Sequence, residues 1–191
     1  KEGTTRTDAP KAASFPPRET AYGYPRNFLN HRFVYVVVSP RARGLSIGIN
    51  FNPDRQCNFD CVYCQVDRSI PGADKSVDLN ILLAELDALL ESAQSGQLWE
   101  HPKFQSVPPA LRVIHDIAFS GDGEPTTHRA FEQVVAACAQ LKRRRQLNQV
   151  KLVLITNASR LHREPVRRAL EILDDNQGEI WAKLEAGTAE Y

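Results

Sequence analysis

The chain has 191 residues, of which 42% are hydrophobic and 25% are charged, and its formal net charge is +1. These values are ordinary for one globular domain, and a net charge near zero excludes a strong overall field for nucleic acid or anionic membranes. Apolar runs such as residues 34–38 and 152–155 fall far short of the roughly 20 residues that span a bilayer. No signal-peptide pattern opens the sequence. We therefore expect a cytoplasmic protein with no membrane partner.

The two ends of the sequence differ from its middle. Residues 1 to about 30 combine prolines with small and charged residues and show no periodicity, which predicts a poorly ordered N-terminal arm, 1–30. The chain contains no Met and stops just after a predicted strand. We therefore expect residues 31–191 to form a core that is incomplete at its carboxyl end, as an amino-terminal fragment would be.

Hydrophobic periodicity predicts alternating strands and helices. β-branched or alternating apolar runs predict strands at 33–38, 45–51, 113–119, 150–155 and 180–184. Apolar residues spaced by three and four predict helices over 79–93 and 131–141, and a third helix from about Pro165; Asp78 is placed to cap the first. This order predicts an α/β fold with a parallel sheet and alternating helices, open or curled into part of a barrel.

Unusual residues follow the predicted strands. The segments 57–64, 121–126, 156–157 and 185–187 each come after a strand end. In parallel sheets, ligands bind beyond the carboxyl ends of the strands. The sequence therefore predicts one site at this edge of the sheet.

Three of the four cysteines lie within eight residues, in the segment 57–64, CNFDCVYC. Such crowding disfavours disulfides and favours a metal, and three thiolates can hold three corners of a cubane iron–sulfur cluster while one iron stays open to a small molecule. A structural zinc site and free structural thiols are the alternatives, although zinc usually takes two separated ligand pairs. Cys138 lies on the apolar side of the second predicted helix, where a buried hydrophobic role is expected.

The segment 57–64 resembles the C-x3-C-x-aromatic-C motif of the radical S-adenosylmethionine (radical SAM) superfamily, with Tyr63 at the aromatic place. The segments 46–50, 120–126 and 181–188 extend this likeness to a subgroup related to wyosine-forming tRNA enzymes, over about residue 33 to the end. The resemblance implies a partial (β/α) barrel of radical SAM type.

The resemblance also implies roles for individual residues. Cys57, Cys61 and Cys64 would be the metal ligands of a [4Fe-4S] cluster. Contacts to S-adenosyl-L-methionine would come from Tyr63, Gly121, Asp122, Gly123, Glu124, Asn157 and Glu185. Asp122 stands where the family has the first glycine of its Gly-Gly-Glu-Pro motif. Each contact has a structural alternative: packing beside the cluster for Tyr63, a turn that caps a helix for 121–126, and caps of the next element for Asn157 and Glu185.

The function implied is that of a radical SAM iron–sulfur oxidoreductase. Its cluster would reduce S-adenosylmethionine to methionine and a 5′-deoxyadenosyl radical, which abstracts hydrogen from an unidentified substrate. No catalytic side chain is needed to generate the radical, so none is named. The family implies a flavodoxin- or ferredoxin-like electron donor, and RNA is among the substrates left open. The alternative is a non-catalytic iron–sulfur or zinc module for electron transfer or interaction.

Two basic segments offer further contacts. The run 142–145, KRRR, closes the second predicted helix and favours a solvated helix end over an RNA-binding patch. Arg160, His162 and Arg163 follow the fourth predicted strand on the ligand side of the sheet. A phosphate or nucleic-acid contact there competes with a plain surface loop.

Overall fold

The computed structural model describes residues 28–39, 43–72 and 74–183. The remaining residues, which include most of the predicted arm and Glu185, lie outside the described part. The strands are β1 Val34–Ser39, β2 Gly44–Asn50, β3 Ile114–Ser120, β4 Lys151–Thr156 and β5 Glu179–Ala182. The α-helices are α1 Leu79–Ser95, α2 Phe131–Arg144 and α3 Glu164–Asp174, and short 3-10 turns are η1 Phe28–Asn30, η2 Gln97–Glu100, η3 Pro109–Leu111 and η4 Pro125–Thr127.

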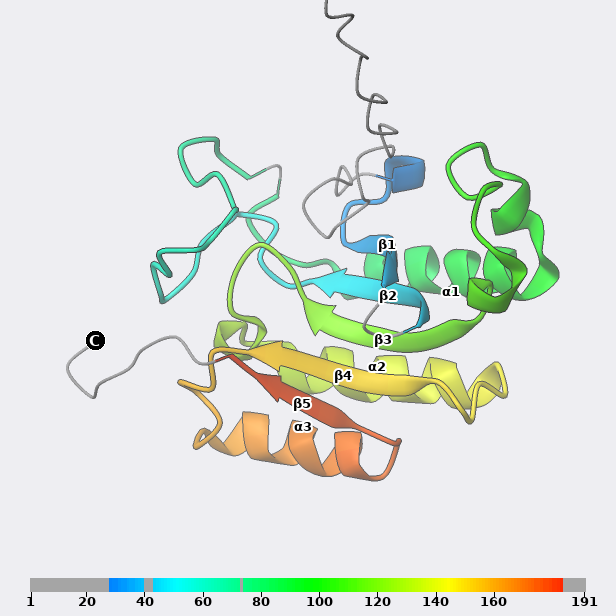
Figure 1. The fold of residues 1–191 in the computed structure, drawn as a ribbon. Helices are drawn as coiled ribbons and strands as arrows, with labels where there is room; N and C mark the ends of the chain where they lie inside the picture. The colour runs from blue at the N-terminus through cyan, green and yellow to red at the C-terminus, as the bar shows by residue number, and fades with distance from the viewer. Residues whose placement is uncertain (1–27, 40–42, 73, 184–191) are drawn as a thin grey trace, which may run out of the picture.

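The five strands form one sheet in the order β1-β2-β3-β4-β5. β2 to β5 are parallel, and their carboxyl ends lie on the left in Figure 1, beside the loop that carries the cysteines. The predicted α/β class and parallel sheet are therefore confirmed in outline. β1, however, pairs antiparallel with β2, because the connection between them is too short for a crossover. The described strands form a five-stranded sheet, and they do not show the predicted partial barrel of radical SAM type.

The two faces of the sheet differ in composition, as side-chain alternation requires. Leu45, Ile47 and Ile49 of β2 belong to the hydrophobic core, together with Ile117 and Phe119 of β3. The other face carries small and polar groups. There Tyr35 lies over Gly48, where a Cβ atom would meet its ring at 2.0 Å, and the Tyr35 hydroxyl lies 2.6 Å from Ser120 Oγ.

The helices are defined by their ends and their buried faces. Asp78 caps α1 and accepts hydrogen bonds from Asn80 N at 2.9 Å and Ile81 N at 3.1 Å, as predicted. Gly96 ends this helix in the left-handed conformation (φ 89°), which glycine adopts at low cost. α3 begins at Glu164 with Pro165 in its first turn, also as predicted. None of the helices in the described ranges is long and apolar enough to cross a membrane.

The carboxyl end of α2 is a packing element. Cys138 is fully buried, as predicted, and burial raises the pKa of its thiol to about 12. Lys142 is buried too, and its Nζ donates to the carbonyl of Asn176 at 3.0 Å. Arg145 pairs with Asp87 at 2.6 Å and with Glu91 on α1. The prediction of a solvated helix end is therefore wrong for Lys142 and Arg145, because both side chains tie α2 to its neighbours.

One buried carboxylate gives the fold a testable pH dependence. Asp116 on β3 is 3% exposed and accepts a hydrogen bond from Ser46 on β2. Burial, the largest cause, raises the pKa of Asp116 above its ordinary value. Folding therefore disfavours the ionised form of Asp116. Because of this group, the free energy of unfolding falls as the pH rises from the ordinary pKa of an aspartate through the raised pKa of Asp116.

We predict that Asp116→Asn, which cannot ionise, gains stability relative to the unmodified protein as pH rises from 3.5 to 7. Urea denaturation at several pH values measures this difference. Asp174→Asn, which changes an exposed carboxylate at the end of α3, is the matched control. An equal pH dependence in the two variants would contradict the assignment of the effect to burial of Asp116.

Candidate functional site

The carboxyl edge of the sheet brings together the loops that the sequence singled out. The loop after β2 carries the three cysteines, the loop after β3 carries residues 121–124, and the loop after β4 begins at Asn157 (Figure 1). Hydrogen bonds join the three loops to one another. The predicted convergence is therefore confirmed for these three segments, whereas the fourth, 185–187, lies outside the described residues. The roles of all four as cofactor contacts stay predictions.

The loop after β3 is fixed against the end of β2. Asn50 Nδ2 donates to Asp122 Oδ2 at 2.8 Å, and Asp122 N donates back to Asn50 Oδ1 at 3.1 Å. Gly121 has φ 149°, and a Cβ atom on it would lie 2.2 Å from Asn50 Oδ1. The close approach of the two loops therefore requires glycine at 121 and uses the Asp122 carboxylate as a partner for Asn50.

Glu124 is the most densely bonded side chain of the edge. It is 3% exposed, and its Oε1 accepts from Thr126 N at 3.1 Å, from Thr126 Oγ1 and from Thr156 Oγ1 at 2.7 Å. Its Oε2 accepts from Asn157 N at 2.6 Å. The carboxylate thus joins the end of β3 to the end of β4, and its hydrogen bonds within the chain give it a structural role.

The cysteine loop is attached to both neighbouring loops. Asn58 accepts from Asn157 Nδ2 at 3.1 Å and donates to Ser159 Oγ at 2.8 Å. The Arg68 guanidinium donates to the Asp122 carbonyl at 3.0 Å and lies 3.6 Å from Cys64 Sγ. These contacts hold the loop at the carboxyl edge of the sheet.

The cysteines themselves do not form the predicted metal centre. Cys57, Cys61 and Cys64 are each half-buried. Within residues 28–39, 43–72 and 74–183, no group of three or more His, Cys, Asp or Glu side chains is arranged so that it could hold a metal ion. Tyr63 is 50% exposed, and Lys183 Nζ lies 5.9 Å from the centre of its ring. The described geometry therefore does not fit a cluster held by this loop.

A cavity of about 520 Å³ opens between the same loops. Its polar lining is basic, since four cationic side chains and one carboxylate of the described residues contribute to it. The lining residues are Phe51, Asn52, Asp54, Gln56, Cys57, Asn58, Lys75, Ser76, Thr127, His128, Arg129, Arg160 and Arg163. Sequence reasoning had singled out Cys57, Arg160 and Arg163, whereas Asn52, Lys75 and Arg129 lie on irregular segments with no pattern that marks them. We call this space the basic cavity.

Two polar atoms of the basic cavity are buried without a partner. Asn52 is 7% exposed, and its Oδ1 has no hydrogen-bond partner among the described residues; the same holds for Arg160 Nε. Buried polar groups are normally satisfied, so each exception calls for an explanation. His128 is satisfied at Nδ1 by Ala130 N at 3.2 Å, and burial, with the nearby Arg129 charge, lowers the pKa of its imidazole.

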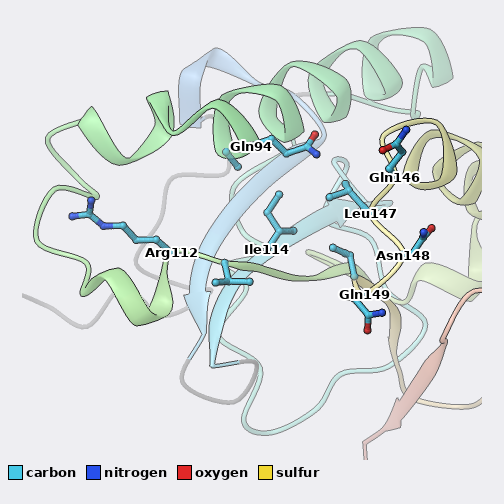
Figure 2. Close-up of a pocket in the computed structure, with 10 residues that line it drawn as sticks. Gln94, Arg112, Ile114, Gln146, Leu147, Asn148 and Gln149 are labelled. Atoms are coloured by element: carbon cyan, nitrogen blue, oxygen red, sulfur yellow. The ribbon is translucent and has the colours of Figure 1, made fainter.

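A second cavity, of about 560 Å³, lies at the opposite, amino edge of the sheet (Figure 2). Figure 2 shows that Gln94 of α1, Arg112 and Ile114 near the start of β3 and the segment 146–149 before β4 surround it. Arg112 donates to the Val107 carbonyl at 2.9 Å and to the Gln105 carbonyl at 3.0 Å. None of the described residues that line this cavity has a buried polar atom without a partner. The basic cavity is therefore the better candidate site.

The fold and the site define an α/β protein with a basic cavity at the carboxyl edge of a mostly parallel sheet. No protein-family model matches the sequence, and no solved structure matches it. The chain is similar to the UPF0026 protein of Synechocystis, with 30% identity over 142 residues that cover 74% of this chain and 45% of the relative. The UPF0026 protein of Methanocaldococcus jannaschii is 28% identical over 135 residues, 68% of this chain and 34% of that protein.

A third relative carries a different name. The GTPase Obg of Brachyspira hyodysenteriae is 25% identical over 139 residues, which cover 72% of this chain but only 17% of that protein. The chain therefore spans less than half the length of each of these relatives.

These findings correct the resemblance to the radical SAM superfamily. The UPF0026 names of the relatives give no radical SAM family evidence, and the described part of the chain has no metal-holding group. The predicted reductive cleavage of S-adenosylmethionine and the alternative of an iron–sulfur or zinc module are contradicted by the same findings. The spacing of the cysteines was specific, but it does not by itself bring the three side chains into a metal-holding arrangement.

The hydrogen bonds of Glu124 lead to a stability prediction. Glu124→Gln replaces one accepting oxygen by an NH₂ group, which then faces a backbone or hydroxyl donor in a buried place. We expect the free energy of unfolding to fall by about 1–3 kcal/mol, the usual cost of a buried group left unsatisfied. Chemical denaturation measures this loss.

Glu132→Gln is the matched control, because Glu132 is paired with Arg168 on the surface of α2 and α3 at 2.7 Å. Such pairs contribute at most about 1 kcal/mol. A loss in Glu124→Gln no larger than in the control would contradict the structural role of Glu124.

Proposed function

We propose that this chain binds a small molecule with an anionic group in the basic cavity at the carboxyl edge of the sheet. The observation that carries the proposal is the concentration of positive charge in the lining of one cavity, to which Arg129, Arg160 and Arg163 all contribute. A ligand with an anionic group would pair with these guanidinium groups.

The charge of the lining supports an anionic ligand. Lys75, Arg129, Arg160 and Arg163 contribute positive charge, against the single carboxylate of Asp54. Since the whole chain carries a formal charge of only +1, this concentration of cations is local. A concave site lined by one sign of charge attracts ligands of the opposite sign.

The size and rigidity of the cavity support a small ligand. Its volume of about 520 Å³ lies within the range of about 300–1,000 Å³ that is usual for small-molecule sites. Its walls are joined by the hydrogen bonds of Glu124 to Asn157 and of Asn157 to Asn58. A site held in place before binding spends less free energy on ordering its own side chains.

The name of the Brachyspira relative suggests a nucleotide hydrolase, but the sequence does not support transfer of that activity. The full chain contains no Gly-x-x-x-x-Gly-Lys-Ser/Thr segment, the loop that cradles phosphates in P-loop GTPases. That the chain is an enzyme, the identity of its cofactors and its partners all stay predictions.

We predict that the chain binds pyrophosphate or citrate saturably at low ionic strength, and that Arg160→Gln weakens this binding roughly tenfold or more, because a charged hydrogen bond contributes about 1.5–3 kcal/mol. Titration followed by ¹H–¹⁵N NMR measures the affinity and shows which backbone amides respond. Arg167→Gln is the control, because Arg167 is exposed on α3 and does not line the cavity. No saturable binding of either anion, or equal losses in the two variants, would contradict the proposal.

A further inference from the structure

We infer that the anionic group is a phosphate and that the ligand class is a hydroxyl-bearing phosphomonoester. This inference rests on the proposed function, because it concerns the same basic cavity. It adds the chemical class of ligand that the lining residues favour. Two features of the described residues carry it: the arginines that line the cavity, two of them on one turn before α3, and the Asp54 carboxylate in the same lining.

Arg160 and Arg163 are held on one turn. Arg163 N donates to the Arg160 carbonyl at 3.0 Å, so the two residues lie three apart on a closed turn after β4. Asn157 Oδ1 accepts from Ser159 N at 3.1 Å and from Ser159 Oγ at 2.7 Å, which fixes the start of the same segment. Both arginines line the cavity from this one segment.

The amino end of α3 adjoins the cavity through Arg163. This residue is the N-cap of an 11-residue helix, and it makes no side-chain hydrogen bond to the first turn. The helix start therefore keeps its positive dipole end, although Glu164 in the first turn reduces it. This dipole end adds to the positive charge of the two arginines that line the cavity from the same segment.

Three of the four cations that line the cavity are arginines. A guanidinium presents its donors in a planar fork that matches two oxygens of a phosphate or carboxylate at once. A carboxylate has only two oxygens and satisfies one such fork. A phosphomonoester has three terminal oxygens and up to two negative charges, so it can engage Arg160 together with Arg129 or Arg163.

An acceptor in the lining selects the rest of the ligand. The Asp54 carboxylate, which accepts from Gln56 N at 3.0 Å, also lines the cavity. It favours a donor such as a hydroxyl group and disfavours a second anionic group near it. The ligand therefore carries hydroxyl groups in addition to its phosphate.

The test compares two dianions of similar size, glycerol 3-phosphate and malate, by NMR titration of the full chain. We expect glycerol 3-phosphate to bind at least tenfold more tightly. Arg160→Lys and Arg163→Lys keep the positive charge but lose the planar pair of guanidinium donors. Each should weaken glycerol 3-phosphate binding at least fivefold. Arg167→Lys should leave it unchanged.

The outcomes separate the two proposals. Equal or tighter binding of malate would overturn the phosphate inference while leaving the anion site intact. Binding of pyrophosphate or citrate but of neither dianion would overturn the phosphomonoester inference alone, whereas binding of none of the four anions would overturn the proposed function as well. A ten-residue polyuridine RNA that binds more tightly than glycerol 3-phosphate and displaces it would also overturn the inference, since the cavity would then serve a nucleic-acid backbone. Unchanged affinity in both lysine variants would show that charge alone, and not guanidinium geometry, holds the ligand.

Discussion

The arrangement of the carboxyl edge depends on one buried carboxylate. Glu124 accepts four hydrogen bonds, which come from its own turn, from the end of β4 and from the residue after it. A charge with 3% exposure is tolerated only because each of its oxygens is satisfied. The position of Asn157, and through it that of Asn58, follows from this interaction. The walls of the basic cavity are therefore set by the fold before any ligand arrives.

The direction of the strands decides which of the two edges binds. Both edges have a cavity of similar volume. At the amino edge, the lining groups belong to chain segments that enter strands, and Arg112 is already bonded to carbonyls. At the carboxyl edge, irregular loops leave the strands and place several cations around a shared space. This is the edge at which open parallel sheets generally bind ligands.

Much of the fold follows from local rules that a sequence displays. The cap at Asp78, the start of α3 near Pro165 and the burial of Cys138 all depend on neighbours within one turn or one helix face, so the sequence predicts them. The direction of β1 was missed because periodicity reports which face is buried and carries no information on strand direction. The short connection after β1 was the available signal.

The sequence predicted where the site lies, but it did not predict which residues line it. Strand ends placed the loops at one edge, whereas Asn52, Lys75 and Arg129 reach the cavity from irregular segments whose course depends on tertiary contacts. The cysteine spacing predicted a metal site, but spacing along a loop does not determine where the sulfur atoms lie. Their positions depend on the path of the backbone, which Arg68 and Asn58 fix through contacts with distant loops.

Hydrogen bonds among Asn58, Asn157 and Ser159 couple two loops. They join the cysteine loop to the segment after β4 that leads to Arg160 and Arg163, so neither loop can move separately without breaking these bonds. Binding at the arginines should then also stiffen the segment around Cys57, which itself lines the basic cavity. Slower amide exchange of that segment would report this coupling.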